Sequence, residues 1–330
     1  MPKTAVVILN YNTADYLQRF LPGLIASCEG LDAQVVVADN ASQDGSVALM
    51  QERFPQVPLI VLDRNYGFTG GYNRALAQLE ADFFVLINSD IEVPGDWLKP
   101  LIEWMETHPE CGACGPKLLS YNQRDTFEYA GAAGGLLDRF GYPFCRGRIL
   151  QKIEKDHGQY DTPANVLWVS GACLMVRASI WKELGGLDDR FFAHMEEIDL
   201  CWRMQLRGWK VTVVPQSYVY HIGGGTLPNE SPFKLRLNFR NNLLLLENNL
   251  PATLGSRRKA RWRIFLRMCL DGLSALSFMI TKRYSFYQAV VQAHKEYWQL
   301  RKPGVIPENP HRPEGLYNGW IVPKGLFGKK

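Results

Sequence analysis

The chain has 330 residues, 46% of them hydrophobic, which is enough to bury a sizeable core and excludes a disordered protein. Its 37 basic and 33 acidic residues leave a formal net charge of only +4, so charge alone does not indicate nucleic-acid binding. The seven cysteines lack the spacing of a disulfide framework, and residues 1–4 lead directly into an apolar strand-like run without room for a signal peptide. We therefore expect a cytoplasmic protein.

Short apolar runs alternate with amphipathic segments along the first third of the chain. This alternation is the β-α-β rhythm of a parallel sheet flanked by helices, and it predicts an α/β fold. Loops that follow parallel strands emerge at one edge of such a sheet, where ligands bind. The predicted strands are residues 5–9, 35–38, 59–62, 83–87 and 112–115, and the predicted helices are residues 16–25, 47–54, 72–79 and 97–107.

Three polar loops follow the first three predicted strands. They carry Asn10 and Asn12, then Asp39, then Asn65 with Gly67. Asp39 ends an apolar strand and could accept a hydrogen bond from the ring N–H of uracil or thymine, although a turn-forming Asp fits the local sequence equally well. Gly67 would let the backbone approach a ligand closely, or simply shape the turn before the next helix.

An acidic signature, Asn88-Ser89-Asp90, stands at the carboxyl end of the apolar run 83–87. At that edge of the sheet Asp90 could hold a divalent cation, whereas short polar residues also commonly close strands. His221 follows two strand-like runs, 211–214 and 217–220, and precedes a run of glycines at 223–225 that predicts a loop able to close over a ligand. A lone His at a strand end is more often a structural hydrogen-bonding residue than a metal ligand.

A second acidic cluster contains Glu196, Glu197 and Asp199, next to the aromatic pair 191–192. Carboxylates in such surroundings suit a general base. The cluster also begins a predicted helix, where the helix dipole gives acids an ordinary structural role.

In their order and spacing these motifs resemble the family 2 glycosyltransferases, inverting enzymes of the GT-A fold, and within them the rhamnosyltransferase-like branch. The resemblance covers about residues 4–247 and implies a mostly parallel central sheet flanked by helices, with a C-terminal helical extension. It is carried by the segments 7–12, 36–42, 65–68, 88–90, 168–172 and 196–203.

The resemblance implies that Asp39 binds the base and that Asp90 is the last acid of a DXD-type motif, holding Mn²⁺ or Mg²⁺ against the donor diphosphate. Asn88 replaces the first acid of that motif, which leaves fewer charged ligands for the metal. The residue matching His221 is a metal ligand in related members, and its imidazole would favour Mn²⁺ over Mg²⁺. Asn10, Asn12, Asn65 and Gly67 would complete the donor site.

The same resemblance makes Glu197 the catalytic base, where the family more often has Asp, so Glu196 and Asp199 remain alternatives. Gly171 and Ala172 would lie near the sugar, and Trp168 would form a wall of the acceptor pocket. Arg240, in an Arg-Asn segment, would contact the diphosphate.

The basic residues gather after residue 250. We expect a glycosyltransferase domain at 1–250, a basic amphipathic helical extension at 251–302 and an extended Pro/Gly-rich tail at 303–330. The extension would lie on the anionic inner face of the plasma membrane, or else pack on the core as an ordinary helix. A membrane position would suit an acceptor carried on a polyprenyl lipid, and nothing in the chain matches a nucleic-acid module.

The sequence therefore predicts a metal-dependent, inverting transferase that moves a sugar, rhamnose among the candidates, from a dTDP- or UDP-sugar to a saccharide or lipid-linked acceptor in cell-surface polysaccharide assembly. A processive synthase is disfavoured because Gln205-Leu206-Arg207-Gly208-Trp209 does not have the spacing of the Gln-x-x-Arg-Trp motif. The alternative is a catalytically silent protein that binds a nucleotide-sugar or docks on the membrane.

Overall fold

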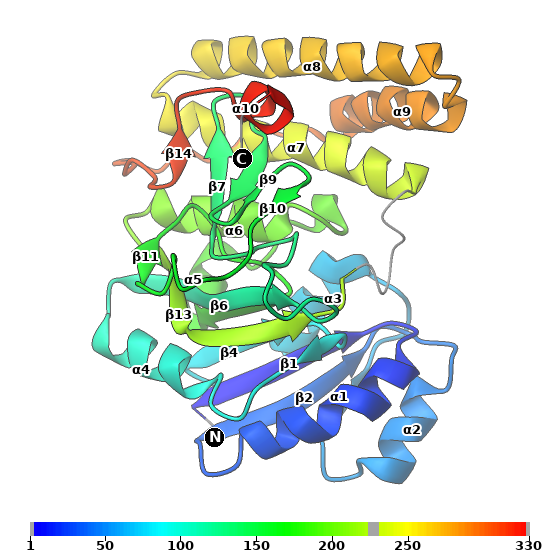
Figure 1. Cartoon of the computed structure of the whole chain (residues 1–330), viewed down its shortest axis with the longest axis vertical. Coiled ribbons are helices and arrows are strands. Elements are labelled where there is room, and N and C mark those ends of the chain that lie inside the picture. The colour runs from blue at the N-terminus through cyan, green and yellow to red at the C-terminus, as the bar shows by residue number, and fades with distance from the viewer. Residues whose placement is uncertain (1–2, 224–230, 328–330) are drawn as a thin grey trace.

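The computed structural model describes residues 3–223 and 231–327, and a mixed nine-stranded sheet lies at the centre of these residues (Figure 1). Its strands are β1 (Thr4–Asn10), β2 (Ala33–Asp39), β3 (Leu59–Val61), β4 (Phe83–Ile87), β5 (Ile91–Glu92), β6 (Cys111–Ser120), β11 (Ala164–Asn165), β12 (Cys173–Arg177) and β13 (Lys210–His221). Their order is β11-β13-β6-β12-β4-β1-β2-β3, with β5 paired to β13.

The N-terminal half of the sheet is parallel. Strand β1 pairs with β2 and β4, and β2 pairs with β3, all in parallel register. Asn10 lies opposite Asp39 in that register, so the two loops that follow these strands begin side by side. Strand β12 then runs antiparallel between β4 and β6.

Strand β6 continues past Pro116 to Ser120, so the end of the predicted strand 112–115, directly before this proline, was wrong. The partner strand β13 explains the difference, because the register between them shifts from Val213–Gly115 to Tyr218–Lys117. This irregularity lies opposite the residue that has no N–H to donate, and bulges are where sheets tolerate proline.

Helices cover both faces of the sheet because alternate strand residues point to opposite sides. Val6 and Ile8 pack into one core with Leu17, whereas Val7 packs into the other core with Tyr72. These helices are α1 (Ala14–Ser27), α2 (Ser46–Arg53), α3 (Gly67–Leu76), α4 (Lys99–Thr107), α5 (Ala178–Leu184) and α6 (Glu196–Gln205), with a short 3₁₀ helix, η1, at Asp189–Phe191.

A second, five-stranded sheet was not anticipated. It consists of β7 (Gly135–Asp138), β8 (Pro143–Cys145), β9 (Arg148–Ile149), β10 (Lys152–Ile153) and β14 (Leu316–Tyr317), in the order β10-β9-β8-β7-β14. The segment expected to be an extended tail supplies β14 and then helix α10 (Ile321–Phe327). It folds back because Leu316 pairs with Leu137 and the backbone N–H of Ile321 donates to the Asp138 carboxylate at 3.0 Å.

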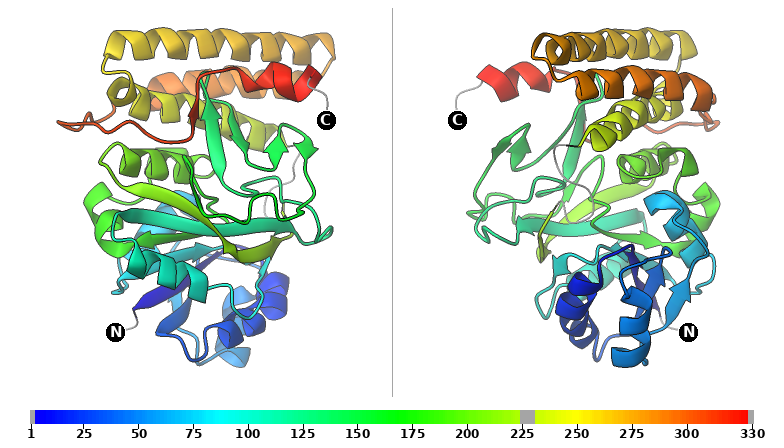
Figure 2. Two further views of the ribbon diagram at one scale, coloured as in Figure 1. Left: turned by 60° about the vertical axis from the view of Figure 1, so that its left-hand side comes forward. Right: turned by 90° about the vertical axis from the view of Figure 1, so that its right-hand side faces the viewer.

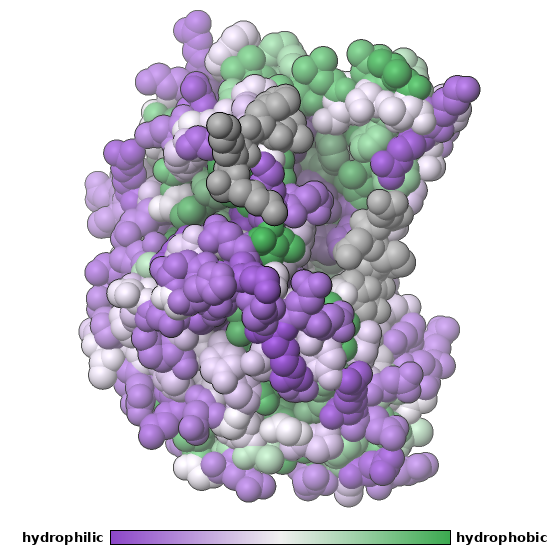
Figure 3. All heavy atoms as spheres, in the orientation of Figure 1, coloured by the Kyte–Doolittle hydropathy of each residue, from purple (hydrophilic) through white to green (hydrophobic). Residues whose placement is uncertain are grey.

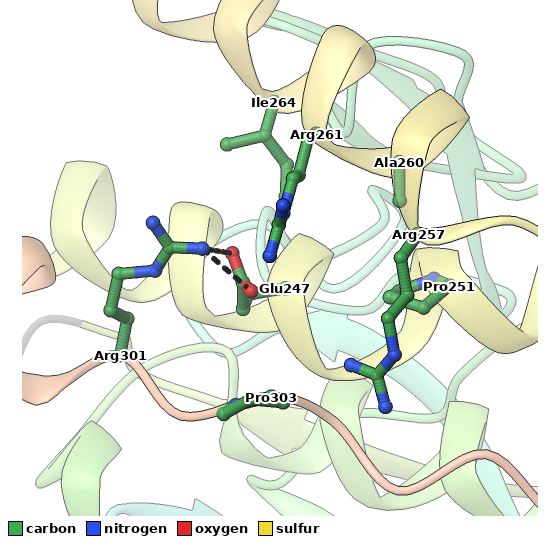
Figure 4. Close-up of a pocket in the computed structure, with 8 residues that line it drawn as sticks. All are labelled: Glu247, Pro251, Arg257, Ala260, Arg261, Ile264, Arg301 and Pro303. Carbon is green, nitrogen blue, oxygen red and sulfur yellow. Dashed lines mark hydrogen bonds and ion pairs between the residues drawn. The ribbon is translucent and has the colours of Figure 1, made fainter.

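Three long helices stack over the sheet at the end opposite α1 and α2 (Figure 2). They are α7 (Pro232–Thr253), α8 (Arg257–Ile280) and α9 (Tyr284–Leu300), so α7 runs through residue 250, where the domain boundary was expected. Glu247 joins α7 to the end of α9. It accepts a hydrogen bond from the Tyr297 hydroxyl at 2.6 Å and another from the Arg301 guanidinium at 2.9 Å (Figure 4). In the part of the chain that the structure describes, no helix has the length and apolar character needed to cross a bilayer.

Candidate active site

The loops after β1 and β2 are locked together at the edge of the sheet. The Asn10 amide donates to Asp39 Oδ2 at 2.8 Å, and the backbone N–H of Ser42 donates to Asp39 Oδ1, also at 2.8 Å. Asn12 joins the same network, because its Oδ1 accepts the backbone N–H of Gln43 at 2.7 Å. The structure thus brings Asn10, Asn12 and Asp39 together, with Asp39 buried beneath the loops.

The loop after β3 is held by a second set of amides. Asn65 Oδ1 accepts the backbone N–H of Gly67 at 2.8 Å and the side-chain amide of Asn40 at 3.0 Å. Gly67 has φ +70°, and a Cβ added there would meet the Phe192 ring at 2.4 Å. Only glycine fits both the backbone conformation and this close contact.

Asp90 and His221 meet where β5, which begins directly after Asp90, pairs with the end of β13. His221 Nε2 lies 3.2 Å from Asp90 Oδ1, and His221 Nδ1 lies 3.5 Å from Glu128 Oε1. Burial opposes a charge on His221, but the hydrogen bonds with the two carboxylates raise its pKa to about 10. Burial likewise opposes a charge on Asp90, yet His221 lowers the net pKa of that carboxyl. The pair is therefore held as a carboxylate and an imidazolium, and a metal ion would have to displace the proton of His221 Nε2 to bind there.

The Asp90–His221 pair fits two neighbouring positions of a six-coordinate metal site. With metal–ligand bonds of about 2.1 Å, adjacent octahedral ligands lie about 3 Å apart, close to the 3.2 Å between Asp90 Oδ1 and His221 Nε2. The Asn88 amide lies 3.5 Å from the same imidazole nitrogen. Among the described residues no group of three His, Cys, Asp or Glu side chains forms a metal site. Diphosphate oxygens and water would have to supply the other ligands, as is usual for Mg²⁺.

Gly224 and Gly225 of the predicted closing loop lie outside the described residues.

The second acidic cluster has a different character. Burial raises the pKa of Glu197 to about 7, although several backbone N–H groups, including that of Gly171, oppose the shift. Burial and the neighbouring Glu197 charge raise the pKa of Glu196 well above its usual range. One oxygen of each carboxyl, Oε2, is buried without a hydrogen-bond partner among the described residues. This pair has the properties of a group that exchanges protons near neutral pH.

Glu197 lies against the small residues that were expected beside it. A Cβ added at Gly171 would be 3.4 Å from Glu197 Cβ and 3.5 Å from the Phe68 ring. The carbonyl of Ala172 accepts the backbone N–H of Asn88 at 2.9 Å, which ties this segment to the Asp90 loop. Gly171 and Ala172 therefore lie between the two acidic signatures.

Asp199 has no freedom to act as a base. It is fully buried and accepts hydrogen bonds from Arg203 at 2.7 Å, Asn248 at 2.9 Å and Asn249 at 2.8 Å. These contacts fasten α6 to α7, so the structure gives Asp199 a structural role.

Asn241 was missed by the sequence reasoning. Its amide nitrogen lies 2.9 Å from the Phe191 carbonyl and 2.7 Å from the carbonyls of Ala193 and His194. The backbone here is strained, with φ of +64° at Phe192, +71° at His194 and +73° at Met195. The Phe192 carbonyl in turn accepts the backbone N–H of Phe68 at 2.7 Å. Asn241 therefore fixes a loop that joins the Gly67 turn to the start of α6.

Two expected site residues lie elsewhere. Trp168 is 3% exposed, and its indole N–H donates to the Leu136 carbonyl at 3.2 Å, so it is a core residue and cannot form a wall of an acceptor pocket. Arg240 donates to the Phe191 carbonyl at 2.8 Å and pairs with Glu296 of α9 at 3.3 Å. Its guanidinium therefore supports the same strained loop, and these contacts give no support to the expected contact with the diphosphate.

The fold and the edge site together define a nucleotide-diphospho-sugar transferase of the GT-A type. The chain belongs to glycosyl transferase family 2, whose sequence model matches residues 5–185. It is 28% identical over 298 residues to an N-acetylglucosaminyl-diphospho-decaprenol L-rhamnosyltransferase of Mycobacterium tuberculosis, which covers 85% of this chain and 93% of that protein. It is 26% identical over 226 residues to the rhamnosyltransferase WbbL of Escherichia coli, covering 66% of this chain and 82% of the relative.

Solved structures confirm the GT-A fold. The mannosyltransferase PcManGT of Pyrobaculum calidifontis, solved with GDP-Man and Mn²⁺, superposes with a TM-score of 0.55 at 13% identity, over 91% of this chain and 88% of the other. Residues 1–349 of S. aureus TarS, solved with UDP, superpose with a TM-score of 0.52 at 17% identity, over 95% and 99% of the two chains. The rhamnosyltransferase-like character expected from the motifs agrees with the sequence relatives.

Proposed function

We propose that this protein is an inverting, non-processive, metal-dependent glycosyltransferase that moves a deoxyhexose, rhamnose first among the candidates, from a dTDP- or UDP-sugar to a lipid-linked saccharide. The observation that carries the proposal is geometric: the Asp90–His221 pair and the partly buried Glu197, whose pKa is raised to about 7, are joined through Gly171 and Ala172 at one edge of the sheet. The similarity to a rhamnosyltransferase whose name specifies a prenyl-diphosphate acceptor supports the acceptor class.

Each residue has a separate task in this proposal. Asp39, with Asn10 and Asn12, holds the nucleoside, and Asn65 with Gly67 shapes the adjoining turn. Asp90 and His221, with the Asn88 amide nearby, would hold Mn²⁺ or Mg²⁺, which neutralises the charge of the departing diphosphate when it is bound.

Glu197 takes the proton of the acceptor hydroxyl as that oxygen attacks the anomeric carbon from the side opposite the diphosphate, which inverts the configuration. Because burial raises its pKa to about 7, Glu197 is a stronger base than an ordinary carboxylate. It is nevertheless deprotonated in a substantial fraction of molecules at neutral pH. Glu196, buried beside it, keeps its own proton and so limits repulsion within the pair.

The outer face of α8 supports peripheral attachment to an anionic membrane. Trp262, Phe265, Leu273 and Ile280 are 62%, 53%, 63% and 71% exposed and share one helix face. Hydrophobic side chains gather along the upper edge of the molecule, over α8 and α9 (Figure 3). At the N-terminal end of α8, Arg257 and Arg261 join Arg301 around a cavity of about 240 Å³ (Figure 4). The exposed Arg258 and Lys259, at the start of α8, lie on the same side of the helix as Trp262. Apolar and basic side chains on one helix face suit an anionic bilayer.

Transfer is tested by incubating the protein with dTDP-rhamnose or UDP-sugars, Mn²⁺ and an N-acetylglucosaminyl-diphospho-prenol. A new lipid-linked disaccharide of inverted anomeric configuration supports the proposal. Calorimetric titration with dTDP and UDP, in Mn²⁺ and in EDTA, tests the donor site independently. Binding without transfer to any acceptor would instead favour a catalytically silent nucleotide-sugar-binding protein.

Membrane attachment is tested by sedimentation with phosphatidylglycerol vesicles. We expect binding that weakens with salt and with Trp262→Glu, and little binding to phosphatidylcholine vesicles. Trp320→Glu, outside α8 and α9, is the control.

A further inference from the structure

We propose that a groove between α7 and α9 binds the diphosphate and the first prenyl units of the lipid-linked acceptor. This inference rests on the proposed function and assigns a place to a part of the acceptor that does not react. The groove has a volume of about 540 Å³ and is lined by Phe233 and Arg236 of α7 and by Tyr287, Val291 and Lys295 of α9, among others.

The groove begins at the wall of the catalytic site. The Phe233 ring packs edge-on against Phe192, with ring centroids 6.5 Å apart. Phe192 belongs to the strained loop before Glu197, and its carbonyl is bonded to the backbone of Phe68. An acceptor whose sugar reaches Glu197 would therefore carry its next groups past Phe192 and Phe233 into the groove.

The charges in the groove suit a diphosphate. It carries Arg236 and Lys295, and none of its lining residues is acidic. The nearest carboxylate, Glu296, is shared by Arg236 and Arg240, each at 3.3 Å. Because two arginines share one carboxylate and Lys295 adds a further cation, the local charge stays positive. Such a site attracts a doubly charged group that a neutral apolar groove would reject.

The far end of the groove suits a prenyl chain. Its lining is more apolar than polar, and Val291 is 37% exposed along it. The groove reaches Ser285, next to Tyr284 at the turn between α8 and α9, where Tyr284 and Ile280 are 57% and 71% exposed. A hydrocarbon chain leaving the groove would thus meet the same apolar surface that we propose rests on the membrane.

The alternative occupant is a protein segment, which would use the apolar lining but has no need of two cations. The test therefore compares two acceptors that share the reacting sugar. One is an N-acetylglucosaminyl-diphospho-prenol, and the other is a simple octyl N-acetylglucosaminide without diphosphate. The variants are Lys295→Glu and Val291→Asp, and Val305→Asp, an exposed valine in the segment after α9, is the matched control.

We expect Lys295→Glu and Val291→Asp to raise KM for the diphospho-prenol acceptor at least tenfold, with kcat, the donor KM and the KM for the octyl glycoside within twofold of the unaltered protein. The control should leave all four constants unchanged. Equal kinetics with the diphospho-prenol acceptor in all variants, or an equal loss with both acceptors, would overturn the groove assignment.

A binding measurement separates this inference from the proposed function. Farnesyl diphosphate is titrated calorimetrically into the unaltered protein and into Lys295→Glu, with Lys295→Ala as a milder variant and thermal unfolding as a check of folding. Binding that weakens at least tenfold in Lys295→Glu supports the groove even if no transfer occurs. No binding to the unaltered protein overturns it even if transfer to other acceptors is normal.

Discussion

The site has two acidic regions, Asp39 with Asp90 and Glu196 with Glu197. They differ in whether their carboxyl oxygens have hydrogen-bond partners. Asp39 and Asp90 accept hydrogen bonds from well-placed partners, Asn10 and Ser42 in one case and His221 in the other. Glu196 and Glu197 each bury an oxygen that has no partner among the described residues. The pKa of Asp90 is lowered, whereas the pKa values of both glutamates are raised.

This difference suits the two aspartates to remaining ionised and the two glutamates to taking up and releasing a proton. A carboxylate that must stay ionised beside a cation or a nucleoside is stabilised by donors before the ligand arrives. A carboxylate that must take a proton is kept where its charge is costly. The predictions below test that division, in order of decreasing effect.

The largest effect is expected for Glu197→Gln, which keeps the shape of the side chain and removes its basicity. We expect kcat to fall about 10³-fold, within the range for loss of a general base. Nucleotide binding by calorimetry should stay within twofold. Glu196→Gln is the matched control and should cost about tenfold or less. A larger fall in kcat for Glu196→Gln than for Glu197→Gln would mean that Glu196, and not Glu197, is the base.

Asp90→Asn should affect only the metal-dependent binding of the donor nucleotide. A metal-held diphosphate contributes several kcal/mol, so we expect dTDP or UDP binding in Mn²⁺ to weaken by about 100-fold. Binding in EDTA should change little. Asp96→Asn, an exposed residue beyond the same strand, is the control. Unchanged Mn²⁺-dependent binding in Asp90→Asn would contradict the metal assignment.

Asn241→Ala should disturb both regions, because the loop it holds joins them. Loss of its amide leaves buried carbonyls unsatisfied, at about 1–3 kcal/mol for each group fully deprived of a partner. We expect unfolding in urea to show a loss of about 2–3 kcal/mol and kcat to fall about tenfold. Asn122→Ala, at an exposed position in the loop after β6, is the control and should change neither quantity measurably. A stable Asn241→Ala variant with normal kcat would show that the strained loop does not depend on this amide.

The pH dependence of kcat tests the glutamate pair without changing any side chain, and its effect is graded. Burial raises the folded-state pKa of Glu197 above its usual value to about 7, so kcat should fall about tenfold for each pH unit below about 7, as the base takes up a proton. For stability the sign is opposite. The protonated form is favoured in the folded state, so this group's contribution to stability is lost as pH rises from about 4.5 through about 7. A flat kcat profile between pH 5.5 and 7 would contradict a base with a raised pKa.

Local sequence patterns predicted where the strands before the proposed donor site end. Asn10, Asp39 and Asp90 follow buried strands, and parallel pairing brings the ends of such strands together. The apolar runs likewise located the strands of the first half of the chain. Glu197 was favoured by resemblance over Asp199, and the structure shows the Asp199 carboxylate engaged by Arg203, Asn248 and Asn249.

Contacts between distant segments could not be read from those patterns. Trp168 follows a strand-like pattern whether it faces a pocket or the core, and only the tertiary packing places it against Gly135. Arg240 and Asn241 act on carbonyls about fifty residues earlier in the chain. The local signal for that contact was the three polar residues Arg240, Asn241 and Asn242 before the leucines 243–246, in a helix that is buried on most sides.

The pairing of β14 with β7 affects the order in which the protein can be completed during synthesis. More than half of the chain separates Leu137 from its partner Leu316. A ribosome adding about 5–20 residues per second needs roughly ten to forty seconds to cover that distance. During this time β7 presents an open edge, with unpaired backbone groups, to any other strand nearby. The nascent chain is therefore open to mispairing in its second sheet after strands β1 to β4 have already been made.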